Sequence, residues 1–273
     1  MEPVPVLSRR HAAGGGGARG LLFTILGEFV LPAGGAAWTS AFLEVLTRLD
    51  VDEKASRQAL MRTAADGWLR SDRVGRRTRW HLTSAAQRLL TEGAERIFGF
   101  ADAASSWDGQ WLVVVSRGTD ADRATRHHLR TRLAWAGCGT PGPGVWISPR
   151  LSNAAEVRSI FAADGLLNEA QIFVAAHDGG DLQAMARAAW DLDAIEERYS
   201  QFIADFSDPL VADPLVHVLE LVHAWRRFPW IDPGLPADLL PDGWSGAKAA
   251  ELFKNRYASC VAAAKLAWQD IAV

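Results

Sequence analysis

Basic and polar side chains that could recognise nucleic acid are grouped in a segment with helical spacing, residues 52–66. Acidic residues stand at its start and Gly67 stands just after its end, as helix termini favour. Lys, Ser, Arg and Gln side chains near the start of such a helix can hydrogen-bond base edges in the major groove. The residues predicted to do so are Lys54, Ser56, Arg57 and Gln58, with Arg62 further along predicted to contact phosphate.

An arginine-rich hairpin is predicted immediately after this helix. Residues 68–82 alternate large and polar side chains on either side of Gly75, and they contain five arginines against one acid, Asp72. Arginines on a hairpin can neutralise phosphates or enter a minor groove. The pattern favours DNA binding, and the alternative is a solvated, arginine-rich hairpin in a partner-binding module. The hairpin residues assigned to DNA are Arg73, Arg76, Arg77 and Arg79.

The elements that would position these side chains form a winged helix-turn-helix. Apolar spacing predicts a helix over 21–30 and a second one, capped by Thr39 or Ser40, that ends at about Leu49. The helix over 52–66 and the hairpin follow. A further helix is expected from Thr83 to about Phe98, and small and polar residues over 99–106 predict a linker. The order helix, helix, helix, hairpin is that of a winged helix-turn-helix.

The charge of the chain is unevenly divided. Its 273 residues carry a net charge of -3, and 49% of them are hydrophobic. Residues 1–99 contain 14 Lys and Arg against 10 Asp and Glu, whereas the remainder contains 15 against 22. This predicts a basic module that meets a polyanion and an acidic body with another role. Two distant cysteines without CxxC spacing indicate a reducing cytoplasm, and no apolar run reaches the roughly 20 residues of a membrane span.

The rest of the chain predicts two more domains. Strands over 111–115, 144–148 and 170–175 alternate with helices over 120–135 and 154–163, as in ferredoxin-like folds. Helices are expected over 193–206, 214–228 and 247–271, the middle one buried, with an extended turn over 229–236. The predicted fold class is α+β: a flexible segment 1–18, an N-terminal winged helix-turn-helix over 19–99, a ferredoxin-like α/β middle domain over 107–178 and a helical C-terminal domain over 190–273.

Motifs for metal binding or nucleophilic catalysis are weak. Glu220-x-x-His223 has the spacing of a helical di-iron site but occurs once, so a hydrogen-bonded polar pair between helices is preferred. The segment 243–247 lacks the second glycine of a nucleophile elbow and the strand before it. No catalytic residue, metal or cofactor is therefore predicted. The 12 tryptophans would suit a pocket for a flat ligand, although packing in cores and interfaces is preferred.

A series of short motifs runs in a fixed order from about Arg19 to near the end of the chain. They include Glu53-x-x-x-Arg57-x-Ala59-Leu60-x-Arg62, Asp66-Gly67-Trp68-Leu69, Val74-Gly75-Arg76-Arg77, Trp107-Asp108-Gly109-x-Trp111, Leu133-x-Trp135-x-Gly137-x-Gly139, Pro143-Gly144-Val145-Trp146-Ile147-Ser148-Pro149 and His223-x-Trp225-Arg226-x-Phe228-Pro229-Trp230-x-Asp232-Pro233. In this order they resemble the PaaX-like transcriptional regulators, the repressors of bacterial phenylacetate catabolism and their relatives.

The resemblance implies a winged helix, a ferredoxin-like middle domain and a helical C-terminal domain that act as a dimer on operator DNA. In the best-known members the inducer is an aryl-coenzyme A thioester. DNA-contact roles carry over to Arg57, Arg62 and the Gly75-Arg76-Arg77 wing. Thr63 and Met61 depart from the family pattern, which bears on the operator sequence more than on the fold. Nothing in the chain identifies the inducer or its binding residues.

The chain is accordingly expected to be a DNA-binding transcriptional regulator and not an enzyme. The expected form is a cytoplasmic homodimer that represses a catabolic operon on double-stranded operator DNA and is released by an acyl- or aryl-coenzyme A effector. The first alternative is a nucleic-acid-processing enzyme similar to small CRISPR-associated endonucleases, but the strand that would end in their metal-binding aspartate ends in Ser116-Arg117. The second is a winged-helix scaffold that does not bind DNA.

Overall fold

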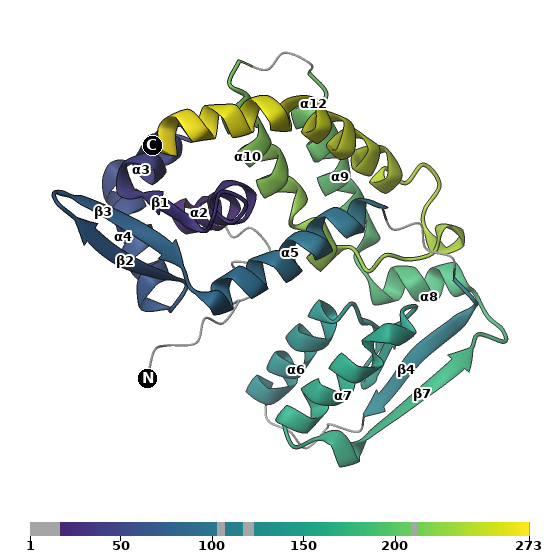
Figure 1. Ribbon diagram of the computed structural model, residues 1–273. Coiled ribbons are helices and arrows are strands. Elements are labelled where there is room, and N and C mark those ends of the chain that lie inside the picture. Colours follow the sequence, from purple (N-terminus) through teal and green to yellow (C-terminus); the bar gives the residue numbers. More distant parts are fainter. Residues whose placement is uncertain (1–16, 103–106, 117–122, 209–211, 273) are drawn as a thin grey trace. The chain divides into compact units, whose positions relative to one another are not determined.

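The computed structural model describes residues 17–102, 107–116, 123–208 and 212–272. Most of the segment expected to be flexible, 1–18, lies outside the described residues. The chain forms two compact units, shown in Figure 1. The first unit comprises Met1–Asp102, Gln201–Phe228 and Ala247–Val273, and the second comprises Ala103–Ser200 and Pro229–Gly246.

The N-terminal part of the first unit contains the predicted helices and hairpin, together with one unpredicted strand. The elements are α2 (Ala18–Ile25), the π-helical η1 (Leu26–Val30), β1 (Ala36–Trp38), α3 (Thr39–Arg48), α4 (Glu53–Ala65), β2 (Leu69–Val74), β3 (Arg77–Leu82) and α5 (Ser84–Asp102). Strand β1 pairs antiparallel with β3, so the hairpin becomes a three-stranded sheet of order β1-β3-β2. Figure 1 shows this sheet beside α3 and α4.

The ends of α4 and α5 follow the local chemistry of the sequence. The Asp52 carboxylate accepts the N–H of Ala55 at 2.8 Å and so caps α4, while Gly67 takes a φ of 78° after its end. Thr83 caps α5 by accepting the N–H of Ala86 at 3.2 Å. The linker predicted from Gly99 is wrong in its first part, because α5 continues to Asp102. Residues 103–106 of that linker lie outside the described residues.

The cap predicted for α3 is wrong. Trp38 is the residue before the helix, and no side chain caps its free N–H groups. The Thr39 hydroxyl is used elsewhere, since it donates to the carbonyl oxygen of Thr78 at 3.1 Å and accepts the indole N–H of Trp80 at 2.9 Å. Thr39 therefore fastens the start of α3 to strand β3.

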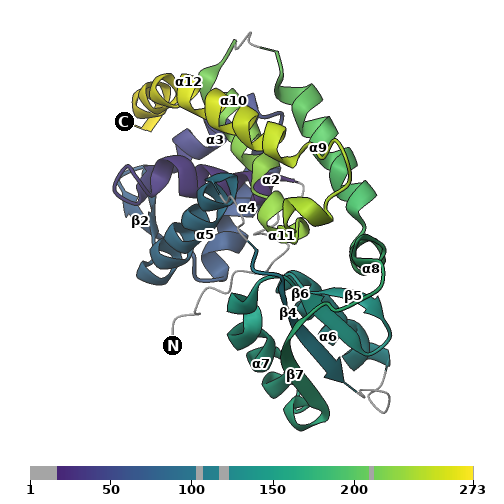
Figure 2. The same cartoon turned by 90° about the vertical axis from the view of Figure 1, so that its right-hand side faces the viewer.

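The C-terminal helices complete the core of the first unit. They are α10 (Pro214–Trp225), α12 (Gly246–Ala272) and the end of α9 (Leu192–Phe206). Helix α10 packs on α2 and is buried on most faces, as predicted. Trp268 of α12 stacks on Phe29 at 5.7 Å between ring centroids, and Figure 2 shows α10 and α12 beside α2 and α3. The boundaries predicted for the three domains remain a prediction. Each of the two compact units joins segments that are distant in the sequence.

The second unit is a four-stranded antiparallel sheet of order β5-β6-β4-β7 with helices between its strands. Its elements are β4 (Gln110–Ser116), α6 (Arg123–Trp135), β5 (Gly139–Gly142), β6 (Val145–Ser148), η2 (Leu151–Asn153), α7 (Ala154–Ala163), η3 (Leu167–Glu169), β7 (Ala170–Ala176) and α8 (Leu182–Ala189). This is the ferredoxin-like arrangement, in which βαβ halves interleave. Three strands were predicted, and the fourth, β5, has the sequence Gly-Thr-Pro-Gly, which carries no apolar alternation.

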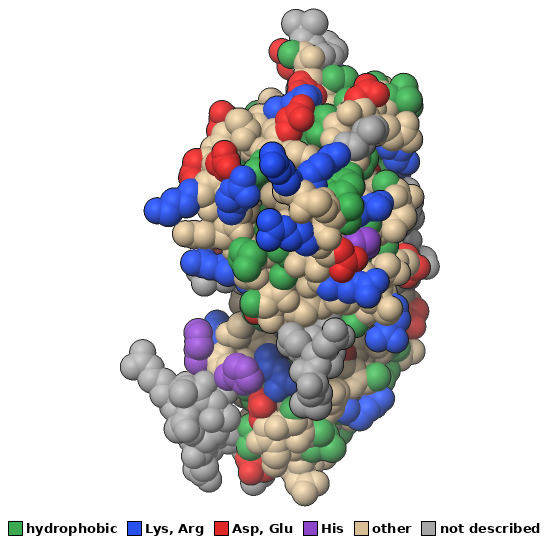
Figure 3. Space-filling view, turned by 60° about the vertical axis from the view of Figure 1, so that its left-hand side comes forward, with side chains coloured by type: hydrophobic (Ala, Val, Ile, Leu, Met, Phe, Trp, Pro, Cys, Tyr) green, Lys and Arg blue, Asp and Glu red, His purple; other side chains and the backbone are tan. Residues whose placement is uncertain are grey.

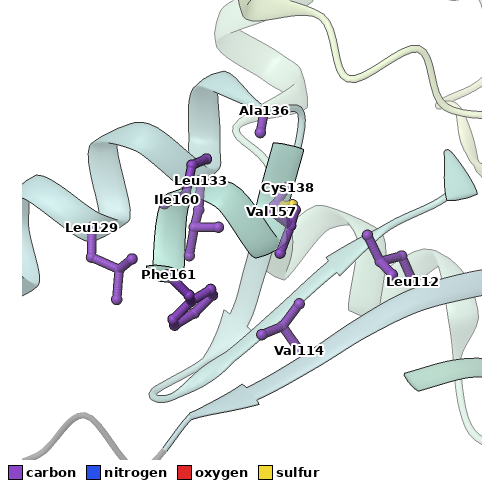
Figure 4. Packing of buried hydrophobic residues seen from close by; sticks show 9 residues of the cluster. All are labelled: Leu112, Val114, Leu129, Leu133, Ala136, Cys138, Val157, Ile160 and Phe161. Atoms are coloured by element: carbon purple, nitrogen blue, oxygen red, sulfur yellow. The ribbon is translucent and has the colours of Figure 1, made fainter. Parts of the chain in front are cut away.

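The core of the second unit lies between the sheet and one layer of two helices. Figure 4 shows Leu129 and Leu133 of α6 and Phe161 of α7 directed toward Leu112 and Val114 of β4. These five side chains are at most 3% exposed. The remaining members of this cluster are Ala136, Cys138, Val157 and Ile160.

The segment predicted as an extended turn over 229–236 is partly helical. A short helix, α11, covers Phe228–Ile231, and only the residues after it are extended until η4 (Ala237–Leu239). The Asp232 carboxylate fixes the turn, because it accepts the Tyr199 hydroxyl at 2.7 Å and the N–H of Gly234 at 2.6 Å. Across the residues that the structure describes, no helix is both long and apolar enough to cross a membrane.

Candidate nucleic-acid interface

Helix α4 has two clearly different faces. Ala59, Leu60 and Thr63 are at most 4% exposed and pack inward. The outer face consists of residues that lie three and four positions apart and are all exposed: Lys54, Arg57, Gln58, Met61 and Arg62. Four of them are predicted DNA contacts, and the structure brings them onto one side of one helix. We call this set the outer face of α4.

Ser56 does not belong to this set. It is fully buried, and its hydroxyl donates to the carbonyl oxygen of Asp52 at 3.0 Å. Ser56 lies one position before Arg57, and one residue turns a helix by about 100 degrees, which carries its side chain to the inner face. The prediction that Ser56 contacts a base is therefore at odds with its burial, and we leave it out of the interface.

Met61 is the residue of this face that sequence reasoning missed. Its side chain is 63% exposed, which is unusual for a large apolar residue on a folded helix. Apolar side chains on a recognition helix contact the methyl group of thymine. The signal was present in the sequence, because Met61 follows Arg57 and Gln58 by four and three residues and so shares their side of the helix.

The wing, residues 69–82, carries its four predicted arginines on the surface. Its turn is made at Gly75, whose φ of 61° suits glycine. Arg73, Arg76, Arg77 and Arg79 are all exposed. Figure 3 brings the side of β2, β3 and α4 forward and shows Lys and Arg side chains gathered on the upper part of that face.

Trp38 of the unpredicted strand β1 supports two of these arginines. The Arg77 guanidinium lies 4.1 Å from the centroid of the Trp38 ring, and the Arg79 guanidinium lies 5.6 Å from it. A cation over an indole face is attracted by the ring quadrupole, which also restricts the flexible arginine. Trp38 therefore acts as a positioning residue for the wing, and its role depends on a strand pairing that the sequence did not predict.

Arg57 is held by an acidic neighbour in the free protein. Its guanidinium lies 2.7 Å from the Glu53 carboxylate one turn earlier, and the two side chains are 57% and 63% exposed. An exposed pair of this kind contributes little to stability. Binding to DNA would therefore replace a weak ion pair with a contact to a base or a phosphate.

The histidine of the Glu220-x-x-His223 motif belongs to a group of buried polar side chains where α10 packs on α2. Nδ1 of His223 lies 3.0 Å from the Thr24 hydroxyl, which also accepts from the buried Arg226 guanidinium at 2.9 Å. The predicted polar pair between helices is thus present for His223, but its partner is Thr24 and not Glu220. Among the described residues no group of three or more His, Cys, Asp or Glu side chains could hold a metal ion.

His223 should make the stability of the chain depend on pH. Burial, together with the charges of Arg226 and Arg227, lowers the pKa of His223 from 6.5 to about 4. Between these two values the unfolded chain binds a proton that the folded chain does not, so the folded state loses stability as the pH falls from about 6.5 to about 4.

Replacing His223 with asparagine should remove this loss of stability at low pH. We expect the difference in free energy of unfolding between wild type and His223→Asn to be constant above pH 7 and to shift in favour of the variant below pH 6.5. Urea denaturation at a series of pH values measures it. Parallel pH curves for the two proteins would contradict the lowered pKa.

A winged helix with an exposed basic face on its third helix and an arginine-bearing wing is the architecture of a DNA-binding transcription regulator. Family models match almost the whole described chain: "PaaX-like protein" over residues 17–86, "PaaX protein central Cas2-like domain" over 104–186 and "PaaX-like protein C-terminal domain" over 190–270. The chain belongs to the PaaX-like family, which confirms the family expected from the sequence motifs.

Two known proteins illustrate the relationship. The transcriptional repressor PaaX of Escherichia coli (strain K12) is 31% identical over 253 residues, which is 87% of this chain and 78% of that protein. The structure of an uncharacterized protein from Mycobacterium tuberculosis matches with a TM-score of 0.61 at 22% identity and covers 93% of this chain and 99% of its own. The first relationship is to a regulator, in agreement with the expectation that the chain is not an enzyme. The second supports the fold alone.

Proposed function

We propose that the chain is a cytoplasmic repressor that binds double-stranded operator DNA as a homodimer and controls a catabolic operon. Helix α4 would enter the major groove with its outer face while the wing neutralises nearby phosphates. The single observation that carries the proposal is that Lys54, Arg57, Gln58 and Arg62 share the exposed side of α4. A dimer of such units would read two half-sites of a partly palindromic sequence.

An acyl- or aryl-coenzyme A thioester is the proposed effector, by analogy with the family. Half-site spacing on DNA is fixed, so a ligand that favours a different placement of the two winged helices lowers the affinity for the operator. The strand that would carry the metal-binding carboxylate of a nuclease, β4, ends at the buried residue Ser116. A serine there is a poor ligand for a hard cation, which argues against the enzyme alternative.

A salt titration with two wing arginines removed tests this function. Each phosphate neutralised on duplex DNA contributes about 0.9 to the slope of log K against log salt. We expect Arg76→Ala with Arg77→Ala to weaken operator binding about tenfold or more at moderate salt and to lower the slope by about 2. Fluorescence anisotropy with duplexes from the promoters beside the gene provides the measurement.

The matched control is Arg158→Ala, which removes an exposed arginine from α7 in the second unit. It should leave the affinity and the slope unchanged. An unchanged slope in the double variant would exclude the wing from the interface. Absence of any salt-dependent DNA binding by the wild type would favour the scaffold alternative instead.

A further inference from the structure

The second unit contains a cavity of about 360 Å³ whose wall includes four tryptophans. They come from separate elements: Trp135 from α6, Trp146 from β6, Trp190 from the end of α8 and Trp230 from α11. Small-molecule sites usually measure about 300–1,000 Å³ and are lined by apolar and aromatic groups with a few polar ones. We call this cavity the tryptophan pocket.

Two rings of the pocket, those of Trp190 and Trp146, are fixed by packing in the second unit. Trp190 lies directly on Gly139, where an added Cβ would fall 2.4 Å from the indole, so only glycine leaves room for it. Trp190 also stacks with Trp111 at 6.4 Å between centroids. Trp146 packs edge-on against the buried Phe161 at 6.1 Å. A wall held in this way is largely formed before a ligand arrives, which reduces the entropic cost of binding.

Two arginines supply positive charge to the same pocket. Arg198 projects from α9 on the helical face of Ala194 and Ile195, and Arg130 projects from α6 one turn before Ala134. The acidic lining residue, Asp191, is engaged otherwise, since its carboxylate accepts the N–H of Ala194 at 3.1 Å and caps α9. The lining therefore favours a ligand that combines an aromatic ring with negative charge.

We propose that the tryptophan pocket binds the aromatic acyl group of the effector, with the anionic coenzyme A portion at Arg130 and Arg198. This inference rests on the proposed function and assigns the effector site that the sequence left open. A cavity of about 150 Å³ can hold benzene, so the pocket accommodates an aryl ring with a short acyl chain. It is too small for coenzyme A as well, which must extend beyond the ring site toward the arginines.

The thiol that lines the pocket does not take part in acyl transfer. Cys138 lines the cavity. Burial, assisted by the charge of Glu156, raises its pKa to about 12. The thiolate is the nucleophilic form of cysteine, so a thioester bound near this protonated thiol is not attacked. An effector can therefore occupy the site and leave it unchanged.

Calorimetric titration of the full-length chain with four probes tests the site. The probes are phenylacetyl-coenzyme A, benzoyl-coenzyme A, acetyl-coenzyme A and coenzyme A. We expect at least one aryl thioester to bind tenfold or more tightly than acetyl-coenzyme A. Trp135 is 40% exposed, so Trp135→Ala should fold and should abolish this preference. Arg198→Ala should weaken all four probes several-fold alike, because it removes a contact to their shared anionic part.

The control variant is Phe173→Ala, which truncates another half-exposed aromatic residue, on β7, outside the pocket. It should bind every probe as the wild type does. No aryl preference in the wild type, or an intact preference in Trp135→Ala, would overturn the pocket assignment.

Operator binding separates this proposal from the proposed function. If aryl thioesters bind in the pocket but leave the operator complex intact, the pocket stands and the effector role of the ligand fails. If they release the operator equally from wild type and Trp135→Ala, the effector role stands and the pocket assignment fails.

Discussion

Replacing Trp225 with alanine is expected to lower the free energy of unfolding by about 3–5 kcal/mol, the usual cost of removing a large buried aromatic side chain. Trp225 is fully buried in the first unit, and its ring stacks on Phe253 of α12 at 4.7 Å between centroids with 12° between planes. Its indole N–H donates to the carbonyl oxygen of Ile97 in α5 at 3.1 Å. The substitution therefore removes the stacking against α12 and the hydrogen bond to α5 at once.

The result would show that the C-terminal helices stabilise the winged helix. Urea denaturation of the full-length chain measures the loss, and Trp135→Ala provides a control at a tryptophan that is 40% exposed. The control should lose much less stability, because surface substitutions usually change it by about 0.5 kcal/mol or less. A loss below about 1 kcal/mol in Trp225→Ala would mean that the core of the first unit tolerates the cavity, and the proposed dependence would be wrong.

The parts of the fold that the sequence predicted are those set by local chemistry. Helix α4 was placed correctly because Asp52 and Gly67 mark its ends and its apolar residues recur at helical spacing. The hairpin was found because alternation and a turn glycine lie within 15 residues. Strands β1 and β5 were missed because their short sequences, Ala-Ala-Trp and Gly-Thr-Pro-Gly, show no apolar alternation.

Long-range packing accounts for what sequence reasoning could not supply. The stacking of Arg77 on Trp38 requires β1 to pair with β3, about forty residues away in the chain. The tryptophans were singled out as a possible ligand site, yet the four that line the pocket come from elements between residues 135 and 230. Only the folded second unit shows which of the 12 tryptophans meet.

Replacing Arg57 with alanine is expected to weaken operator binding by about 1–3 kcal/mol, the range found for a side chain that reads a base. Arg57 lies in the second turn of α4, in the middle of the outer face, where a helix in the major groove comes closest to base edges. Its ion pair with Glu53 is exposed on both sides, so releasing the arginine costs little. Glu53→Ala should therefore change affinity in the opposite direction and strengthen binding slightly, because it removes a negative charge beside the phosphates.

Anisotropy titrations with operator and with unrelated duplex DNA distinguish a base contact from a phosphate contact. If Arg57 reads a base, Arg57→Ala lowers operator affinity more than affinity for unrelated DNA, and sequence preference relaxes at one position. If Arg57 touches only phosphate, both affinities fall together. The control is Arg88→Ala, an exposed arginine of α5 that belongs neither to the outer face nor to the wing, which should leave both affinities unchanged. If Arg57→Ala binds both duplexes with the same affinity as the wild type, the outer face of α4 is excluded from the interface, since Arg57 is at its centre.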